Sequence, residues 1–226
     1  MTNLSIRDIA ESLGAAVAMG GLVVLSPLLR PWYRKWGAQE EELQARLPGD
    51  ERVSNPRLET TRGVTVQAPP EQIWPWLAQL GQSRGGWYSY ERLENLAGCD
   101  IQNADQILSQ YQNLSPGDRL RLGPEGYPFF TAVEVDPGRS LVLMSGPQPP
   151  EDEDVAWAWV FVLEPVDGDT TRLIARNRVG YPPTFGNRLM WRAFVDPVAF
   201  VMERRMLHTL KQRAESMNGR GNGSDA

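Results

Sequence analysis

The sequence predicts an α+β fold in which an antiparallel sheet packs against helices. Strand-like segments follow one another from residue 119 to residue 179, and a long helix-like segment, Asp196 to Ala214, comes after them. Strands that are grouped along the chain, and do not alternate with helices, favour an antiparallel sheet. A third observation is the uncharged stretch from Ser12 to Leu29, which predicts an apolar helix ahead of the sheet domain.

The composition fits one globular domain with an appendage. Of the 226 residues, 41% are hydrophobic and 23% are charged, which suffices for one core. The net charge of −5 and the pI near 5.1 provide no basic field, so we expect no nucleic-acid partner. The single cysteine, Cys99, rules out an internal disulfide framework, and the single histidine, His208, excludes a Cys/His zinc cluster. We expect neither a metal nor a cofactor.

The segment Asp196 to Ala214 has the marks of a long packing helix. Asp196 can cap the first free amides, and Pro197 suits the first helical position. At 100° per residue one side is apolar, and it carries Ala199, Met202, Met206, Leu207, Leu210 and Ala214. These residues either fill a core or line a cavity. Glu203 lies among them, where an unpaired carboxylate is costly to bury, so we expect it to reach the rim or to have a cationic partner.

The stretch Ser12 to Leu29 predicts a membrane anchor within residues 1–37. As a helix it would reach roughly 27 Å, close to the thickness of a bilayer core. Basic and aromatic residues alternate directly after it, as at a membrane interface: Arg30, Trp32, Tyr33, Arg34, Lys35 and Trp36. This basic excess predicts a single pass through the cell membrane, with the domain on the cytoplasmic side. The alternative is a helix that lies on the domain or in a dimer interface.

The rest of the chain divides into three parts. Residues 38–57 are polar and turn-rich, which predicts a linker, and residues 217–226 are expected to form a disordered tail. Residues 58–216 form the domain, with helices predicted after Ala68-Pro69-Pro70 and near Ser89 to Ala97. Its expected strands are Thr60 to Gln67, Arg119 to Leu122, Pro128 to Val135, Ser140 to Met144, Val155 to Leu163 and Thr171 to Val179. The acidic loop GPQPPEDED is expected to be a solvated hairpin tip.

These elements carry a family resemblance over Leu58 to Ala214. It rests on the stretches TTRGVTVQAPPEQIWPWLAQLGQ, RGGWYSYERLENLAGCDIQNAD, PGDRLRLGP, WVFVLEP, TRLIARNR and FVMERRML. Together they resemble the START-related helix-grip superfamily (SRPBCC), which includes polyketide cyclase/dehydrase-like and lipid-binding proteins, and within it a bacterial membrane-anchored subgroup. The resemblance implies a curved antiparallel sheet wrapped around the last helix, with a cavity between them for a hydrophobic small molecule. It implies catalysis for only some members.

Aromatic residues on the strand Val155 to Leu163 are candidates for the cavity wall. Trp157, Trp159 and Phe161 alternate onto one face, since successive side chains of a strand point to opposite sides. Against the long helix they make either a solid core or an aromatic-walled pocket.

The strand Thr171 to Val179 places Arg172, Ile174, Arg176 and Arg178 on one face. That face is either charged and solvent-exposed, or Arg176 or Arg178 points inward. In the second case the arginine would pair with Glu203 and hold the polar end of a ligand, because guanidinium groups bind carboxylates with two hydrogen bonds.

The stretch RGGWYSY supplies further candidates, Trp87, Tyr88 and Tyr90, which either form the mouth of a pocket or pack on the sheet. Its spacing is not that of a phosphate-binding loop. Asp100, Asn103 and Asp105 favour a capped turn over a metal site.

Three functions follow from these patterns. The leading one is a membrane-tethered binding or carrier domain for a hydrophobic small molecule or lipid. The second is a cyclase- or dehydratase-like enzyme that uses Tyr88, Tyr90, Glu203 and an arginine, and the third is a structural or regulatory membrane protein with a filled core. The full set of predicted cavity residues is Trp87, Tyr88, Tyr90, Trp157, Trp159, Phe161, Arg176, Arg178, Met202, Glu203 and Met206.

Overall fold

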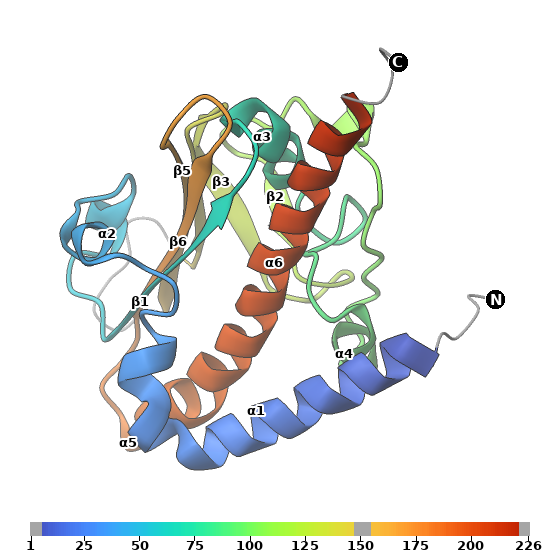
Figure 1. The fold of residues 1–226 in the computed structure, drawn as a ribbon. Coiled ribbons are helices and arrows are strands. Elements are labelled where there is room, and N and C mark those ends of the chain that lie inside the picture. Colours follow the sequence, from blue (N-terminus) through green and yellow to red (C-terminus); the bar gives the residue numbers. More distant parts are fainter. Residues whose placement is uncertain (1–5, 147–154, 222–226) are drawn as a thin grey trace.

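The structure is a computed structural model that describes residues 6–146 and 155–221 (Figure 1). Apart from Gly146, the acidic loop expected at a hairpin tip lies outside these residues. The strands are β1 (Leu58–Val66), β2 (Arg119–Arg121), β3 (Phe129–Asp136), β4 (Ser140–Ser145), β5 (Ala156–Pro165) and β6 (Thr171–Gly180). The helices are α1 (Ile6–Tyr33), α2 (Glu40–Gln44), α3 (Pro70–Ala78), α4 (Glu91–Leu96), α5 (Phe185–Leu189) and α6 (Asp196–Gly221), with short 3-10 helices η1 (Asp50–Val53) and η2 (Ser109–Tyr111) and a π-helical turn η3 (Met190–Val195).

The six strands form one antiparallel sheet in the order β1-β6-β5-β4-β3-β2. The sheet is curved, and helix α6 runs along one side of it (Figure 1). This confirms the predicted α+β class and the helix-grip arrangement. The side of the sheet that faces α6 is called the inner face below, and the opposite side the outer face.

The inner face is apolar because alternate residues of each strand point toward α6. In the register of β1, β6 and β5, Phe161 lies beside Ala175, and Trp159 lies beside Asn177. Met206 and Leu207 of α6 are buried against them in the same core. The alternation read from the sequence therefore placed the aromatic residues of β5 on the correct side.

The segment 38–57, predicted to be a linker, instead covers the outer face. It contains α2 and η1, which lie on the side of the sheet away from α6 (Figure 1). Glu42 accepts two hydrogen bonds from the Arg172 guanidinium, at 2.7 and 2.8 Å, and Asp50 accepts one from Arg176 at 2.8 Å. Both carboxylates are buried. Two acids of the segment thus neutralise arginines of the sheet, while most of its other polar residues are exposed.

Removal of the Glu42 carboxylate should therefore destabilise the domain. We expect Glu42→Ala to lower the free energy of unfolding by about 1.5–3 kcal/mol, because a hydrogen-bonded charge is lost from a buried site. Glu41→Ala, a change at an exposed neighbour, should alter it by less than about 0.5 kcal/mol. Denaturant melts of the two variants check this, and equal effects would contradict the buried role of the segment.

The start and the end of α6 differ from the prediction. The chain enters α6 directly from the π-helical turn, so Asp196 has helical backbone angles and does not cap free amides. Its carboxylate instead accepts hydrogen bonds from other elements, which are described below. At the other end α6 continues to Gly221, into the region where a disordered tail was expected, and residues 222–226 lie outside the described part.

Helix α1 is, by length and composition, long and apolar enough over Ala10–Tyr33 to cross a membrane. One side of it packs against α6: Tyr33 stacks on Phe200 with ring centroids 5.4 Å apart, and Ala15 belongs to the same cluster. The other side is exposed and apolar, and it carries Leu13, Val17, Val24 and Leu28. A groove of about 600 Å³ remains between α1 and α6.

Candidate functional site

A cavity of about 260 Å³ lies between the inner face of the sheet and helix α6. Side chains from β3, β5, β6, α4 and α6, and from the segments around α4 and after β2, surround it. The lining residues are Trp87, Ser89, Glu94, Cys99, Leu122, Phe130, Trp157, Trp159, Asn177, Ala199, Met202, Glu203 and Met206. Most of these are aromatic or aliphatic, so the cavity is suited to an apolar occupant.

One wall of the cavity consists of packed aromatic rings. Trp87 stacks on Trp159 with centroids 5.3 Å apart and planes 14° apart, and Phe130 meets Trp157 edge to face at 5.3 Å. The indole N–H of Trp87 donates to the carbonyl of Arg121 at 3.0 Å. Because the polar atom of Trp87 is satisfied elsewhere, its ring contributes an apolar surface.

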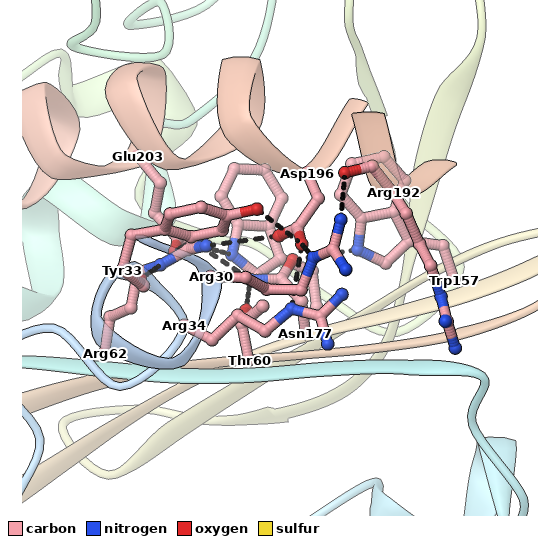
Figure 2. A network of polar contacts seen from close by, with 11 residues as sticks. Arg30, Tyr33, Arg34, Thr60, Arg62, Trp157, Asn177, Arg192, Asp196 and Glu203 are labelled. Carbon is pink, nitrogen blue, oxygen red and sulfur yellow. Dashed lines mark hydrogen bonds and ion pairs between the residues drawn. The ribbon is translucent and has the colours of Figure 1, made fainter. Parts of the chain in front are cut away.

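Glu203 is one of the polar residues that line the cavity, and Figure 2 shows the polar contacts around its carboxylate. Its Oε1 accepts hydrogen bonds from the indole Nε1 of Trp159 at 2.7 Å and from Nδ2 of Asn177 at 2.8 Å. Its Oε2 accepts a short hydrogen bond from Nη1 of Arg62 on β1. Glu203 and Arg62 are both buried. The expected cationic partner of Glu203 exists, and three donors from three strands fix the carboxylate in place.

The same network continues from the cavity to helix α1 (Figure 2). Arg62 donates from Nε to the carbonyl of Tyr33 at 3.0 Å, and its Nη2 lies 3.8 Å from Oδ1 of Asp196. Asp196 accepts from Nε of Arg34 at 2.8 Å and from the Tyr33 hydroxyl at 3.2 Å. The end of α1, the start of α6 and strand β1 are thus joined through one buried set of charges.

The prediction that Arg176 or Arg178 pairs with Glu203 is wrong. Both arginines point to the outer face, where Arg176 pairs with Asp50 and Arg178 pairs with Glu59. Residues of β6 with even numbers point outward and those with odd numbers inward, so Asn177 is the residue that reaches Glu203. The outer face is also not the solvated surface that was the alternative, because α2 and η1 cover it.

The other predicted residues divide into two groups. Trp87, Trp157, Trp159, Met202, Glu203 and Met206 line the cavity. Phe161 packs behind Trp159, with centroids 5.0 Å apart, and belongs to the core.

Tyr88 is buried with its hydroxyl accepting from Nε2 of Gln79 at 2.6 Å, and burial raises its pKa to about 12. Tyr90 faces the groove beside α1, where Arg205 lies over its ring. Neither tyrosine reaches the cavity.

The sequence did not identify Arg62 or Glu94. The alternation of β1 could have identified Arg62, because it places this arginine on the inner face, beside Ala175. No sequence pattern pointed to Glu94, because ERLENL has the composition of an exposed helix. In the structure Glu94 lines the cavity, and its Oε2 is buried without a hydrogen-bond partner among the described residues. Burial first, and the charge of Glu91 second, raise the pKa of Glu94 from 4.5 to about 7.

The raised pKa of Glu94 predicts a dependence of stability on pH. Between about pH 4.5 and pH 7 the folded state holds a proton on Glu94 that the unfolded state has lost, so stability must fall as the pH rises through this window. Glu94→Gln should lack this contribution. We expect the variant to gain stability relative to the parent between pH 5 and pH 8, as measured by urea melts at each pH. A constant difference would contradict the raised pKa.

No family model and no curated protein matches the chain. Solved structures do match: protein MLL2253 from Mesorhizobium loti is 15% identical with a TM-score of 0.43, over 70% of this chain and 98% of that one. A Thermobifida fusca protein is 17% identical with a TM-score of 0.43, and the match covers 70% of this chain and 94% of that protein. A norcoclaurine synthase point mutant from Thalictrum flavum is 13% identical with a TM-score of 0.42, and the match covers 71% of this chain and 96% of that protein. Likenesses at this level carry no argument about function, and the fold assignment rests on the sheet order and the position of α6.

Proposed function

We propose that the protein is a membrane-tethered binding or carrier module that holds a small hydrophobic molecule between the sheet and helix α6. The observation that carries this proposal is the cavity itself, which is lined by tryptophans and methionines and by the hydrogen-bonded carboxylate of Glu203. Its volume of about 260 Å³ is at the lower limit of ligand pockets, about 300 Å³, which favours a small molecule over a whole lipid.

The arrangement supports binding more than catalysis. Glu203 receives hydrogen bonds from Arg62, Trp159 and Asn177, so three of the roughly four lone-pair sites of its carboxylate are occupied. This reduces its capacity as a general base, which needs a free lone pair within reach of the substrate proton. Tyr88 and Tyr90, the other residues of the cyclase-like hypothesis, lie outside the cavity.

Helix α1 supports the membrane part of the proposal. Its outward side exposes large apolar residues, with Val17, Val24 and Leu28 each more than three-quarters exposed. A continuous apolar surface of this kind is unfavourable in water and is typical of a contact with lipid. The specific form of the proposal is a single pass over Ser12 to Leu29 with the domain on the cytoplasmic side.

A full pass requires α1 to separate from the domain along most of its length. In the structure Glu11 pairs with Arg205 at 2.9 Å, and Ala15 packs in a cluster with Val201. Charged residues of α6 cannot follow α1 into hydrocarbon, so these contacts have to open on insertion.

Native mass spectrometry of the full-length protein in mild detergent tests the cavity. We expect a bound small molecule as an added mass, and we expect its loss in Ala199→Trp, which fills the cavity from α6. Val198→Trp, at an exposed neighbour on the same helix, is the matched control and should keep the added mass. An added mass that persists in Ala199→Trp, or none in the parent, would overturn the proposal.

Fractionation tests the tether. We expect the full-length protein in the membrane fraction after an alkaline carbonate wash, and we expect the double variant Val17→Asp/Val24→Asp in the soluble fraction. Recovery of the parent protein in buffer without detergent would refute the anchor. Protease access from the outer side of the cell would refute the orientation alone.

A further inference from the structure

The cavity contains an acid that the protein itself does not neutralise. Among the described residues, its titratable lining groups are Glu94, Cys99 and Glu203, and no lysine, arginine or histidine of this part of the chain lines it. Glu203 has Arg62 as its counter-ion. Glu94 has no ion-pair partner among the described residues, and its Oε2 is buried without a hydrogen bond there.

The charged groups around Glu94 do not supply a cation either. Glu91, on the same helix, accepts from the backbone N–H of Asn103 at 3.0 Å and repels Glu94. From the neighbouring helices, Glu11 of α1 and Arg205 of α6 are paired with each other. Beyond α4, the Cys99 thiol has its own pKa raised, first by burial and then by Glu94. A cation that pairs with the ionised Glu94 would therefore have to come with the ligand.

The remaining wall is also favourable for a cation. The rings of Trp87, Trp157, Trp159 and Phe130 line the same cavity. Aromatic faces attract ammonium groups within about 6 Å through the negative charge on their surfaces, and tryptophan is the most effective. An anionic ligand such as a carboxylate would meet Glu94, whose charge no cation of the described cavity lining compensates.

We propose that the cavity takes a small hydrophobic amine, whose ammonium group pairs with Glu94 while its apolar body packs against the aromatic wall. This inference rests on the proposed binding function and names the class of ligand. It follows from an unpaired buried oxygen, the absence of lining cations and the tryptophan faces.

The pairing predicts a direction for the effect of pH on binding. Glu94 has a pKa of about 7 in the empty cavity, so below pH 7 it must release a proton before it can pair with a cation. The affinity for an ammonium ligand should therefore fall by about tenfold for each pH unit below 7 and be nearly constant from pH 7 to pH 8.5. A neutral ligand should show no such fall.

Three probes with the same ring separate the possible ligand chemistries: 2-phenylethylamine, 2-phenylethanol and phenylacetate. Binding to the full-length protein in mild detergent is measured by calorimetry and by quenching of tryptophan emission.

At pH 8 we expect the amine to bind at least tenfold more tightly than the alcohol, and the carboxylate most weakly. Glu94→Gln should abolish the preference for the amine and its pH dependence while leaving the alcohol within about twofold. Glu91→Gln is the matched control, since Glu91 does not line the cavity. It should keep the preference for the amine, with the pH dependence moved to lower pH because the charge of Glu91 no longer raises the pKa of Glu94.

Several results would overturn the inference. Equal binding of amine and alcohol, tighter binding of phenylacetate, or a preference for the amine that survives Glu94→Gln would each show that Glu94 is not a counter-ion, while the cavity would still bind a ligand. If no probe binds although the native mass spectrum shows an added mass, the amine inference fails and the binding function stands. If the added mass is absent as well, both fail.

Discussion

Replacement of Arg62 by alanine is expected to destabilise the protein by about 3–5 kcal/mol. The change leaves the buried Glu203 carboxylate without its charged partner, and a stranded buried charge costs more than the ion pair gains. It also removes the hydrogen bond from Arg62 to the carbonyl of Tyr33. Urea melts of the full-length protein measure the loss. Arg57→Ala, at an exposed position, should cost less than about 0.5 kcal/mol.

A double-mutant cycle separates the pair from general damage to the core. Arg62→Met and Glu203→Gln should each be destabilising, and the double variant should lose distinctly less than the sum of the two losses, because no unpaired charge remains. Additive effects would mean that Arg62 and Glu203 contribute independently. In that case the Arg62–Glu203 ion pair would add nothing to stability beyond the separate contributions of the two side chains.

The second large effect is expected for Trp159→Ala, again about 3–5 kcal/mol, because the change empties a large, well-packed site. Trp159 is only 9% exposed, stacks on Trp87 and donates to Glu203. Trp159→Phe keeps a ring and removes the donor, so its smaller cost, about 1–3 kcal/mol, reports the hydrogen bond to the carboxylate. A loss below about 1 kcal/mol for alanine in denaturant melts would show that the cavity wall is not held by packing.

The fold was predictable because its signals are local. The alternation of Trp157, Trp159 and Phe161 and the apolar side of the last helix depend on the periods of strand and helix alone. The helical phase correctly placed Met202, Met206 and Glu203 on the side that faces the sheet. These parts of the site needed no knowledge of which strands are neighbours.

The charge pairing was not predictable in this way, because it depends on contacts between distant segments. Arg62 and Glu203 are 141 residues apart, and Arg172 and Glu42 are 130 residues apart. A polar segment whose acids neutralise the arginines of a strand has the same composition as a polar segment that is exposed to water. Composition alone therefore does not distinguish the two. The same ambiguity hid Glu94, since the helix ERLENL is polar enough for solvent but borders the cavity.

The uneven attachment of helix α1 has a mechanical consequence. Tyr33 and Arg34 clamp its C-terminal end to Asp196, whereas its packing against α6 leaves a groove of about 600 Å³ between the two helices. Surfaces that face a gap forgo most of their dispersion contacts, so little free energy resists their separation there. In the proposed membrane-tethered form, helix α1 would act as an arm hinged near Tyr33 that a bilayer draws away from the domain. The clamp would then keep the Arg62–Glu203 pair at a fixed distance from the membrane surface, close to small molecules that partition into the bilayer.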